Sequence, residues 1–300
     1  MLIRLEAAGR NLYASRGFTG GRQLGENQKQ RDYWSGPVGE NWARLQDTFD
    51  RGFTHITAAL MEFAAPRRGE NVLDIGCAAG TTTIALAEAV APGEAVGIDI
   101  SAPLVADARR RAAAAGSPAQ FVEADVSDHR FAAEFDLAYS RFGLMFFADP
   151  VRSLAAIRRA LKPGGRLASA SWCPFEEIAT IFAPYDAARD LLPPDPPATP
   201  GAPGPFGLCD PGRIRAILAE AGYGDIIVER CERPSPMGAT VDEALTQAMN
   251  LGPLAFALRH SDEATRDAVR ERIRPVLERY KTGEGIAPPA AFWLAGARAG

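Results

Sequence analysis

Two periods of hydrophobic positions alternate along most of the chain. Short apolar runs with strand character lie at 71–75, 94–100, 119–125, 135–141 and 166–172. Between them, apolar positions with helical spacing occupy 81–90, 102–115 and 149–161. Strands and helices that alternate at this spacing predict βαβ units. We therefore expect a mostly parallel sheet with helices on both faces and right-handed crossovers.

The regions on either side of this alternation have a different pattern. Before it, helical spacing predicts a helix over 41–64. After Trp172, helices are expected at 175–192, 211–222, 241–258 and 262–280. Two more strands are expected at 224–232 and 290–298. The sequence thus predicts an α/β protein with a Rossmann-like, seven-stranded, mostly parallel sheet and a helical cap inserted among its last strands.

These elements divide the chain into four segments. Residues 1–32, rich in Gly, Arg and Gln, are expected to form a flexible N-terminal extension, and 33–172 the ligand-binding core. Residues 173–209 are expected to form a helical and Pro-rich cap segment, and 210–300 the rest of the sheet with the inserted cap helices. The Pro-rich stretch 193–205 excludes a central strand or helix, which leaves a flexible connector or the mobile edge of a substrate lid.

Composition and charge narrow the classes of function. Hydrophobic residues make up 47% and charged residues 23% of the 300 residues, as in an ordinary globular protein, and the net charge is −4. The basic runs at 109–111 and 158–159 lie in helical patterns. We interpret them as solvated helix faces and expect no nucleic-acid partner.

Cysteine usage and hydropathy indicate the cellular setting. The four cysteines, Cys77, Cys173, Cys209 and Cys231, form no C-x-x-C pair and match no zinc spacing. No stretch reaches the ~20 apolar residues of a membrane helix, and the N-terminus lacks the continuous apolar run of a signal peptide. We expect reduced thiols, no metal site, no membrane span and a cytoplasmic protein, and we consider a homodimer as its assembly.

The segment most informative about chemistry is Val72–Thr81, V-L-D-I-G-C-A-A-G-T, in which a buried strand leads through a glycine turn into a helix. Gly76 and Gly80 allow the backbone to turn sharply and to approach a ligand closely. The helix N-terminus that follows offers unpaired N–H groups. The candidate cofactor contacts in this segment are Asp74, Gly76, Cys77, Ala78, Gly80 and Thr81.

Two phosphate-binding patterns fail in this turn. A Walker loop needs a Lys after its last glycine, but Thr81 follows Gly80 directly. A dinucleotide loop that starts at Gly76 would need glycines where Ala78 and Thr81 stand. The carboxylate of Asp74 would repel a pyrophosphate. It would attract a ligand that carries an ammonium and a sulfonium, and S-adenosylmethionine (SAM) is such a ligand.

Two more carboxylates follow at the ends of the next two strands. An acid at the position of Asp99 hydrogen-bonds ribose hydroxyls, and the neighbouring Ile100 would suit one face of an adenine ring. Asp125 is placed to accept from the exocyclic amine of adenine, with Val126 offering a backbone N–H. Because the carboxyl ends of parallel strands share one edge of the sheet, we expect these acids to surround one cofactor.

At this point the chain resembles a known family. Val72–Thr81 is similar to the first SAM-binding motif of class I SAM-dependent methyltransferases. Segments similar to the later motifs follow in the same order: G-I-D-I-S (97–101), E-A-D-V (123–126), F-D-L-A-Y-S-R-F-G-L-M-F-F (135–147) and L-K-P-G-G-R-L (161–167). The resemblance covers residues 30–172, in particular to the ubiquinone/menaquinone-biosynthesis-like subgroup. It implies SAM as cofactor and a small organic methyl acceptor. The sequence departs at Ala78, where the family more often has Gly.

The resemblance also implies roles near the methyl group. In this family the segment before the first helix lies over the methionine end of SAM, so Trp34 is a candidate contact; packing on the sheet edge is the alternative. Ser140 and Arg141 end the fourth strand, beside the reacting methyl. The S-R-F-G sequence there lacks the Asn/Asp-Pro-Pro-aromatic signature of amino-methylating DNA enzymes. Two interpretations of Arg141 are open: it orients an acidic substrate, or it pairs structurally with a nearby carboxylate.

Catalytic residues are not identified by the sequence. Methyl transfer needs a general base only if the acceptor must lose a proton. His129 is the first candidate for that base, and Arg141 is a candidate for orienting the substrate. Seven cap residues are expected to line an apolar pocket or to form the core of the lid: Phe175, Phe182, Tyr185, Phe206, Met249, Phe256 and Trp293. A non-catalytic SAM-binding or partner-binding relative is the alternative to a methyltransferase.

Overall fold

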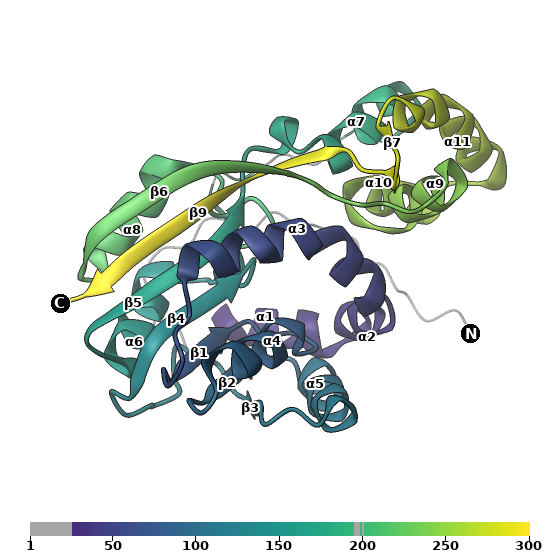
Figure 1. Cartoon of the computed structure of the whole chain (residues 1–300). Helices are drawn as coiled ribbons and strands as arrows, with labels where there is room; N and C mark the ends of the chain where they lie inside the picture. Colours follow the sequence, from purple (N-terminus) through teal and green to yellow (C-terminus); the bar gives the residue numbers. More distant parts are fainter. Residues whose placement is uncertain (1–25, 195–198, 200) are drawn as a thin grey trace, which may run out of the picture.

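In the computed structural model, which describes residues 26–194, 199 and 201–300, one seven-stranded sheet forms the body of the protein (Figure 1). Its strands are β1 (Val72–Ile75), β2 (Ala95–Asp99), β3 (Gln120–Glu123), β4 (Phe135–Arg141), β5 (Leu161–Trp172), β6 (Tyr223–Pro234) and β9 (Pro289–Ala299). Their order is β3-β2-β1-β4-β5-β9-β6, and β9 runs antiparallel to both of its neighbours. The predicted seven-stranded, mostly parallel sheet is confirmed.

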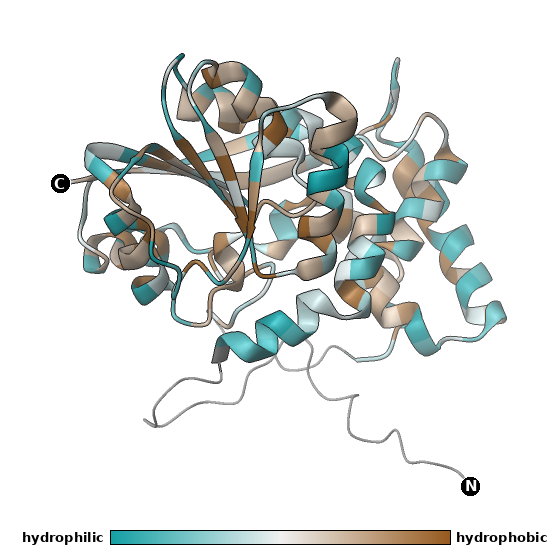
Figure 2. Cartoon of the chain, turned by 90° about the horizontal axis from the view of Figure 1, so that it is seen from below, coloured by the Kyte–Doolittle hydropathy of each residue, from teal (hydrophilic) through white to brown (hydrophobic). Residues whose placement is uncertain are grey.

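Five helices pack along this sheet. They are α3 (Gln46–Ala64), α4 (Thr81–Val90), α5 (Ala102–Ala115), α6 (Pro150–Ala160) and α8 (Pro211–Glu220). The strand order reverses at β1, so right-handed crossovers place α4 and α5 on one face and α6 and α8 on the other. Hydrophobic residues concentrate on the central strands between these layers (Figure 2). The helix expected at 211–222 is α8, and the Asp210 side chain caps its start by accepting from the Arg213 backbone N–H at 2.7 Å.

A second hydrophobic core lies in the cap, away from the sheet. The cap consists of α7 (Ala179–Ala187), α9 (Val241–Asn250), α10 (Gly252–Ala257), α11 (Glu263–Glu278) and a short hairpin of β7 (Lys281–Thr282) and β8 (Gly285–Ile286). Tyr185, Leu245, Leu254 and Ile273 come from its four helices and are buried in one cluster. The long strands β6 and β9 reach from the sheet to this cap (Figure 1). The predicted cap among the last strands is confirmed.

Several predicted helices are broken where the backbone leaves helical geometry. The helix expected at 41–64 is α2 (Pro37–Arg44) followed by α3. The N–H of Leu45 closes α2 and its carbonyl accepts the first bonds of α3. The helix expected at 241–258 breaks at Leu251, whose extended backbone, with φ −129° and ψ 146°, separates α9 from α10. The helix expected at 175–192 is α7 between two short 3₁₀ turns, η2 (Phe175–Glu177) and η3 (Arg189–Leu191).

Two predicted boundaries differ in position. α1 (Glu26–Ser35) begins inside the segment assigned to the N-terminal extension, so residue 32 is not an element boundary; residues 1–25 lie outside the described residues. β5 begins at Leu161, before the strand expected at 166–172, so residues 162–165 lie within it, where its register with β4 shifts. The shift lets β5 pair with the whole length of β4 despite the Pro and two Gly residues there.

Candidate cofactor and acceptor cavity

A cavity of about 1710 Å³ lies between the carboxyl ends of the parallel strands and the cap. It sits where the strand order reverses between β1 and β4, which is the place where open α/β sheets bind ligands. The predicted site residues that line it are Trp34, Gly76, Cys77, Ala78, Asp99, Ile100, Asp125, Val126 and Arg141. The glycine turn and two of the three predicted acids thus meet at one edge of the sheet.

The turn after β1 has an unusual backbone. Gly76, Ala78 and Gly80 all have positive φ, at +67°, +47° and +84°. A Cβ on Gly76 would lie 2.9 Å from the Cα of Gly143, so no larger residue fits there. Ala78 holds this conformation at the position where the related motif more often has Gly, and its N–H donates to Asp99 Oδ2 at 2.9 Å. Ala78 therefore adopts the left-handed backbone conformation that a glycine would adopt more easily at this position.

Asp99 connects this turn to the end of β2. Its Oδ2 accepts from Ala78, and its Oδ1 accepts from the Ser101 N–H at 2.9 Å. Burial raises the pKa of Asp99, and backbone N–H donors from Ser101 and Ala78 oppose that rise. A carboxylate has about four acceptor positions, so Asp99 retains capacity for hydroxyl donors from the cavity.

Asp74 lies one layer behind the cavity lining. Its Oδ2 accepts from the hydroxyls of Thr82 and Thr83 at 2.6 and 2.7 Å, so it anchors the first turn of α4. Burial raises the pKa of Asp74 to about 6, although both hydroxyls and the charge of Arg141 lower it. Its Oδ1 is buried without a hydrogen-bond partner among the described residues. Asp74 is therefore not among the residues that line the cavity, and its contact with the cofactor stays a prediction.

Three other predicted cofactor residues also lie behind the lining. A Cβ on Gly80 would be 2.8 Å from the ring of Phe121, so this glycine leaves room for that ring beside the start of α4. Thr81 donates to Asp50 Oδ2 at 2.9 Å, away from the cavity. Ser140 is buried and its hydroxyl donates to a β1 carbonyl at 2.8 Å. The contacts of these three residues are with other parts of the protein around the turn, and none of the three lines the cavity.

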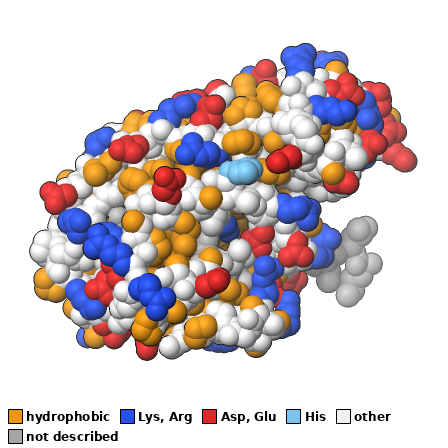
Figure 3. All heavy atoms as spheres, in the orientation of Figure 1, with side chains coloured by type: hydrophobic (Ala, Val, Ile, Leu, Met, Phe, Trp, Pro, Cys, Tyr) orange, Lys and Arg blue, Asp and Glu red, His pale blue; other side chains and the backbone are white. Residues whose placement is uncertain are grey.

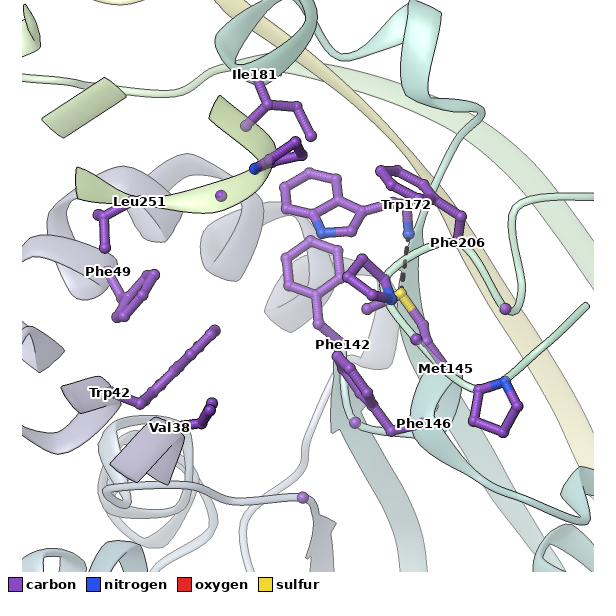
Figure 4. A pocket seen from close by; sticks show the side chains of 18 of the residues that line it. Val38, Trp42, Phe49, Phe142, Met145, Phe146, Trp172, Ile181, Phe206 and Leu251 are labelled. Atoms are coloured by element: carbon purple, nitrogen blue, oxygen red, sulfur yellow. Dashed lines mark hydrogen bonds between the residues drawn. The ribbon is translucent and has the colours of Figure 1, made fainter. Parts of the chain in front are cut away.

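The cap side of the cavity is lined by large apolar side chains, most of which the sequence analysis did not select. Phe142 stacks on Trp172 with ring centroids 4.0 Å apart, and Trp42 stacks on Phe49 on the opposite side (Figure 4). Other apolar lining residues are Val38, Phe53, Met145, Phe146, Ile181 and Leu251. The signal available in the sequence was the apolar run F-G-L-M-F-F (142–147) directly after a strand end, where loops are normally polar.

The aromatic residues that were selected divide into two groups. Phe175, Tyr185, Phe206 and Phe256 line the cavity, whereas Phe182, Met249 and Trp293 do not. Trp293 instead donates to the Cys209 carbonyl at 2.7 Å. Trp34 lines the cavity and packs edge-on against Phe146 with ring centroids 5.1 Å apart. Its contact with the cofactor stays a prediction.

The two catalytic candidates are placed differently. His129 lies in the loop after β3, where its ring packs 4.4 Å from that of Phe131, and it does not line the cavity. Arg141 does line it, donates to Thr57 Oγ1 at 2.7 Å and lies 4.0 Å from Asp50 Oδ1. The structure therefore brings Arg141, and not His129, to the reacting edge. Among the described residues, no group of His, Cys, Asp or Glu is arranged to hold a metal ion.

Comparisons with known proteins give matches to methyltransferases. Residues 72–165 match the family described as Methyltransferase domain. A demethylmenaquinone methyltransferase from Thermus thermophilus is 35% identical over 36% of this chain and 49% of its own length. Nocamycin O-methyltransferase from Saccharothrix syringae is 30% identical over 58% of this chain and 66% of its own length. The chain spans about a third to a half of the length of the first curated relatives that it matches.

Solved structures share the fold. The phosphoethanolamine N-methyltransferase 2 of Haemonchus contortus, solved with S-adenosyl-L-methionine, has a TM-score of 0.55 at 18% identity, over 89% of this chain and 59% of that one. The Haloferax volcanii protein solved with the methyltransferase activator Trm112 has a TM-score of 0.52 at 22% identity, over 90% of this chain and 96% of that one. Residues 72–165 are therefore similar to a methyltransferase domain, and the chain carries this segment on a seven-stranded sheet whose fold is shared with these solved structures.

Proposed function

We propose that this protein transfers a methyl group from SAM to a small organic acceptor, at an O, N or C atom. The observation that carries the proposal is the continuity of one cavity, which joins the acidic glycine-turn edge of a class I sheet to an apolar space under the cap. The Thermus and Saccharothrix relatives, named as methyltransferases of a menaquinone precursor and of nocamycin, support the small-molecule class.

The residues at the cofactor edge suit SAM. Asp99 and Asp125 line this part of the cavity and favour a cationic ligand over an anionic one. Ile100 and Val126 add apolar surface beside these acids. Gly76 lines the cavity, and because a Cβ there would lie 2.9 Å from the Cα of Gly143, the turn packs closely against the segment that follows β4. When bound, SAM supplies a methyl group that is already activated by its sulfonium leaving group.

The contribution of the chain is then mainly to position the acceptor and exclude water. Correct orientation of two reactants can lower a barrier by about 7–11 kcal/mol. Among the described residues, no histidine lines the cavity, so we assign no general base. The apolar walls around Phe142 and Trp172 would keep water from the reacting atoms.

Calorimetric titration with SAM, with NADH as the control ligand, tests the cofactor. We expect SAM to bind and NADH not to bind, and the reverse result would contradict the proposal. Turnover is then measured as S-adenosylhomocysteine formed against a panel of phenols, quinols and carboxylic acids. SAM binding without turnover on any of them would favour the alternative, a non-catalytic relative of the fold.

The cellular setting is part of the same proposal. We propose a cytoplasmic protein, because all four cysteines are free thiols, and a homodimer as its assembly. Nucleic acid is not proposed as a partner, because charges of both signs are interspersed on the face seen in Figure 3. Within the described residues, no helix has the length and apolar character needed to cross a membrane. Light scattering after size exclusion tests the dimer.

A further inference from the structure

Arg141 is a largely buried charge in the acceptor half of the cavity, which is the part lined by apolar side chains under the cap. Its side chain is 11% exposed, at the end of β4. The other charged residues that line this half, among those the structure describes, are exposed at its rim: Glu176, Asp210, Arg213 and Arg259. A ligand that enters between the apolar walls would therefore meet this guanidinium as the one charged group away from the rim.

The positive charge of Arg141 is only partly balanced by the protein. Its hydrogen bond to Thr57 is to a neutral hydroxyl, and its distance to Asp50 Oδ1, 4.0 Å, is beyond hydrogen-bond range. Asp50 is engaged more closely by Arg111, at 2.8 Å. Asp74 is a second carboxylate near this charge, because the charge of Arg141 acts to lower its pKa, but its Oδ1 has no hydrogen-bond partner among the described residues. A guanidinium has five N–H donors, so Arg141 retains donors beyond its bond to Thr57. Arg141 thus keeps both donors and charge available to a ligand.

One aromatic ring lies beside this charge, and two more rings lie beside that one. The guanidinium carbon lies 5.3 Å from the ring centroid of Phe53, and Phe53 is 5.3 Å from Phe142 and 5.9 Å from Trp172 between centroids. These rings present flat apolar surface next to one cation. Ligand pockets commonly measure about 300–1,000 Å³, so a cavity of about 1710 Å³ has room for the cofactor and an acceptor of several rings.

We propose that Arg141 binds the anionic group of the methyl acceptor, and that this acceptor is an extended, largely apolar organic acid with a planar ring system. Thr57 and Asp50 act as positioning residues that orient the guanidinium. The inference rests on the proposed function, because it names the substrate class of the same cavity. It decides between the two interpretations of Arg141 in favour of substrate orientation.

Two fluorescent probes test the charge separately from the apolar walls. 8-Anilinonaphthalene-1-sulfonate and N-phenyl-1-naphthylamine share their rings, but only the first carries a sulfonate. We expect Arg141→Met to raise the Kd of the sulfonate probe by about tenfold or more, and that of the neutral probe by less than about threefold. Arg141→Lys should keep most of the affinity for the sulfonate. Arg259→Met, at the exposed rim, is the matched control, with an expected change below about threefold.

Several outcomes would overturn the assignment. Equal losses of both probes in Arg141→Met would mean that the residue shapes the wall rather than binds an anion. A loss in Arg259→Met as large as in Arg141→Met would place the anion at the rim. If Arg141→Met fails to fold, as judged by circular dichroism, Thr57→Val takes its place, with an expected loss of about threefold for the sulfonate probe alone.

The same proteins are titrated with SAM to keep the two proposals apart. Arg141→Met should retain SAM affinity within about threefold, because the cofactor edge is formed by other residues. Wild-type protein that binds the sulfonate probe through Arg141 but does not bind SAM would contradict the proposed function and not the anion site. Wild-type protein that binds SAM while the two probes respond alike to Arg141→Met would contradict only the anion site.

Discussion

At the cofactor edge of the cavity, main-chain atoms and short polar side chains determine the shape, whereas large side chains determine it under the cap. Asp99 accepts two backbone N–H groups, and Gly76 leaves no room for a Cβ. On the other side, Phe142 and Trp172 meet ring to ring, and residues from the cap complete the wall. The difference suggests why the cofactor can be inferred from a motif while the acceptor cannot.

A turn with a required backbone geometry tolerates few substitutions, so it can be recognised as a sequence motif. An apolar wall can be rebuilt from many combinations of side chains of similar volume. We therefore expect substitutions at the cofactor edge to change SAM binding or stability, and substitutions under the cap to change acceptor binding alone. The following predictions test that division, from the largest expected effect to the smallest.

Asp74→Asn should remove a pH-dependent cost in stability. The pKa of Asp74 is raised to about 6 in the folded protein from 3.8, so the folded state binds this proton more tightly than the unfolded chain does. The free energy of unfolding then falls by ~3 kcal/mol as pH rises from about 4 to 6, and stays lower above that range. In urea unfolding without ligand, the free energy of unfolding of Asp74→Asn should increase relative to that of the wild type as pH rises over this range.

The control for Asp74 is a carboxylate with the opposite shift. Burial acts to raise the pKa of Asp136, but hydrogen bonds from Lys162 and from the Asn71 backbone lower it overall. The ionised Asp136 therefore adds to the free energy of unfolding above its unfolded pKa, and this contribution is lost as pH falls. As pH rises, the free energy of unfolding of Asp136→Asn should fall relative to that of the wild type. Parallel pH profiles for wild type and Asp74→Asn would contradict the raised pKa of Asp74 in the folded protein.

Asp99→Ala should weaken SAM binding by about thirtyfold or more. The substitution leaves the N–H groups of Ala78 and Ser101 without their carboxylate and removes an acceptor from the cavity. Calorimetry measures the loss, and the neutral naphthylamine probe should keep its Kd within about twofold. SAM affinity close to that of the wild type would show that the turn does not depend on this carboxylate.

Trp172→Ala should raise the Kd of the neutral probe by about tenfold, because the wall loses the ring that stacks on Phe142. SAM affinity should stay within about threefold, since Trp172 lies on the cap side of the cavity. Trp172→Phe keeps a ring and should lose less than about threefold in probe affinity. A large loss of SAM binding in Trp172→Ala would mean that the two halves of the cavity are not separable.

His129→Ala should change SAM affinity, probe affinity and turnover by less than about twofold, because this side chain does not line the cavity. Steady-state kinetics with the first active acceptor provides the measurement. A tenfold fall in kcat would restore His129 as a candidate general base and would require a loop rearrangement to bring it to the acceptor.

The convergence of the turn, Asp99 and Asp125 at one cavity could be predicted from the sequence alone. It follows from local patterns, since parallel strands that alternate with helices bring their carboxyl ends to one edge whatever the rest of the chain does. The cap among the last strands followed in the same way from extra helices between strands. Arg141 was also brought to that edge by its position at the end of a strand.

Only the tertiary structure decided which side chains face the cavity. Asp74 lies behind the lining because hydroxyls from the following helix donate to its carboxylate. Ser140 lies there because its hydroxyl donates a hydrogen bond to a carbonyl of the neighbouring strand. Phe142 reaches the acceptor space from a left-handed backbone position, at φ +64°, that no periodicity predicts. These orientations depend on contacts between segments far apart in the chain, and such contacts form only when the whole sheet and cap are assembled.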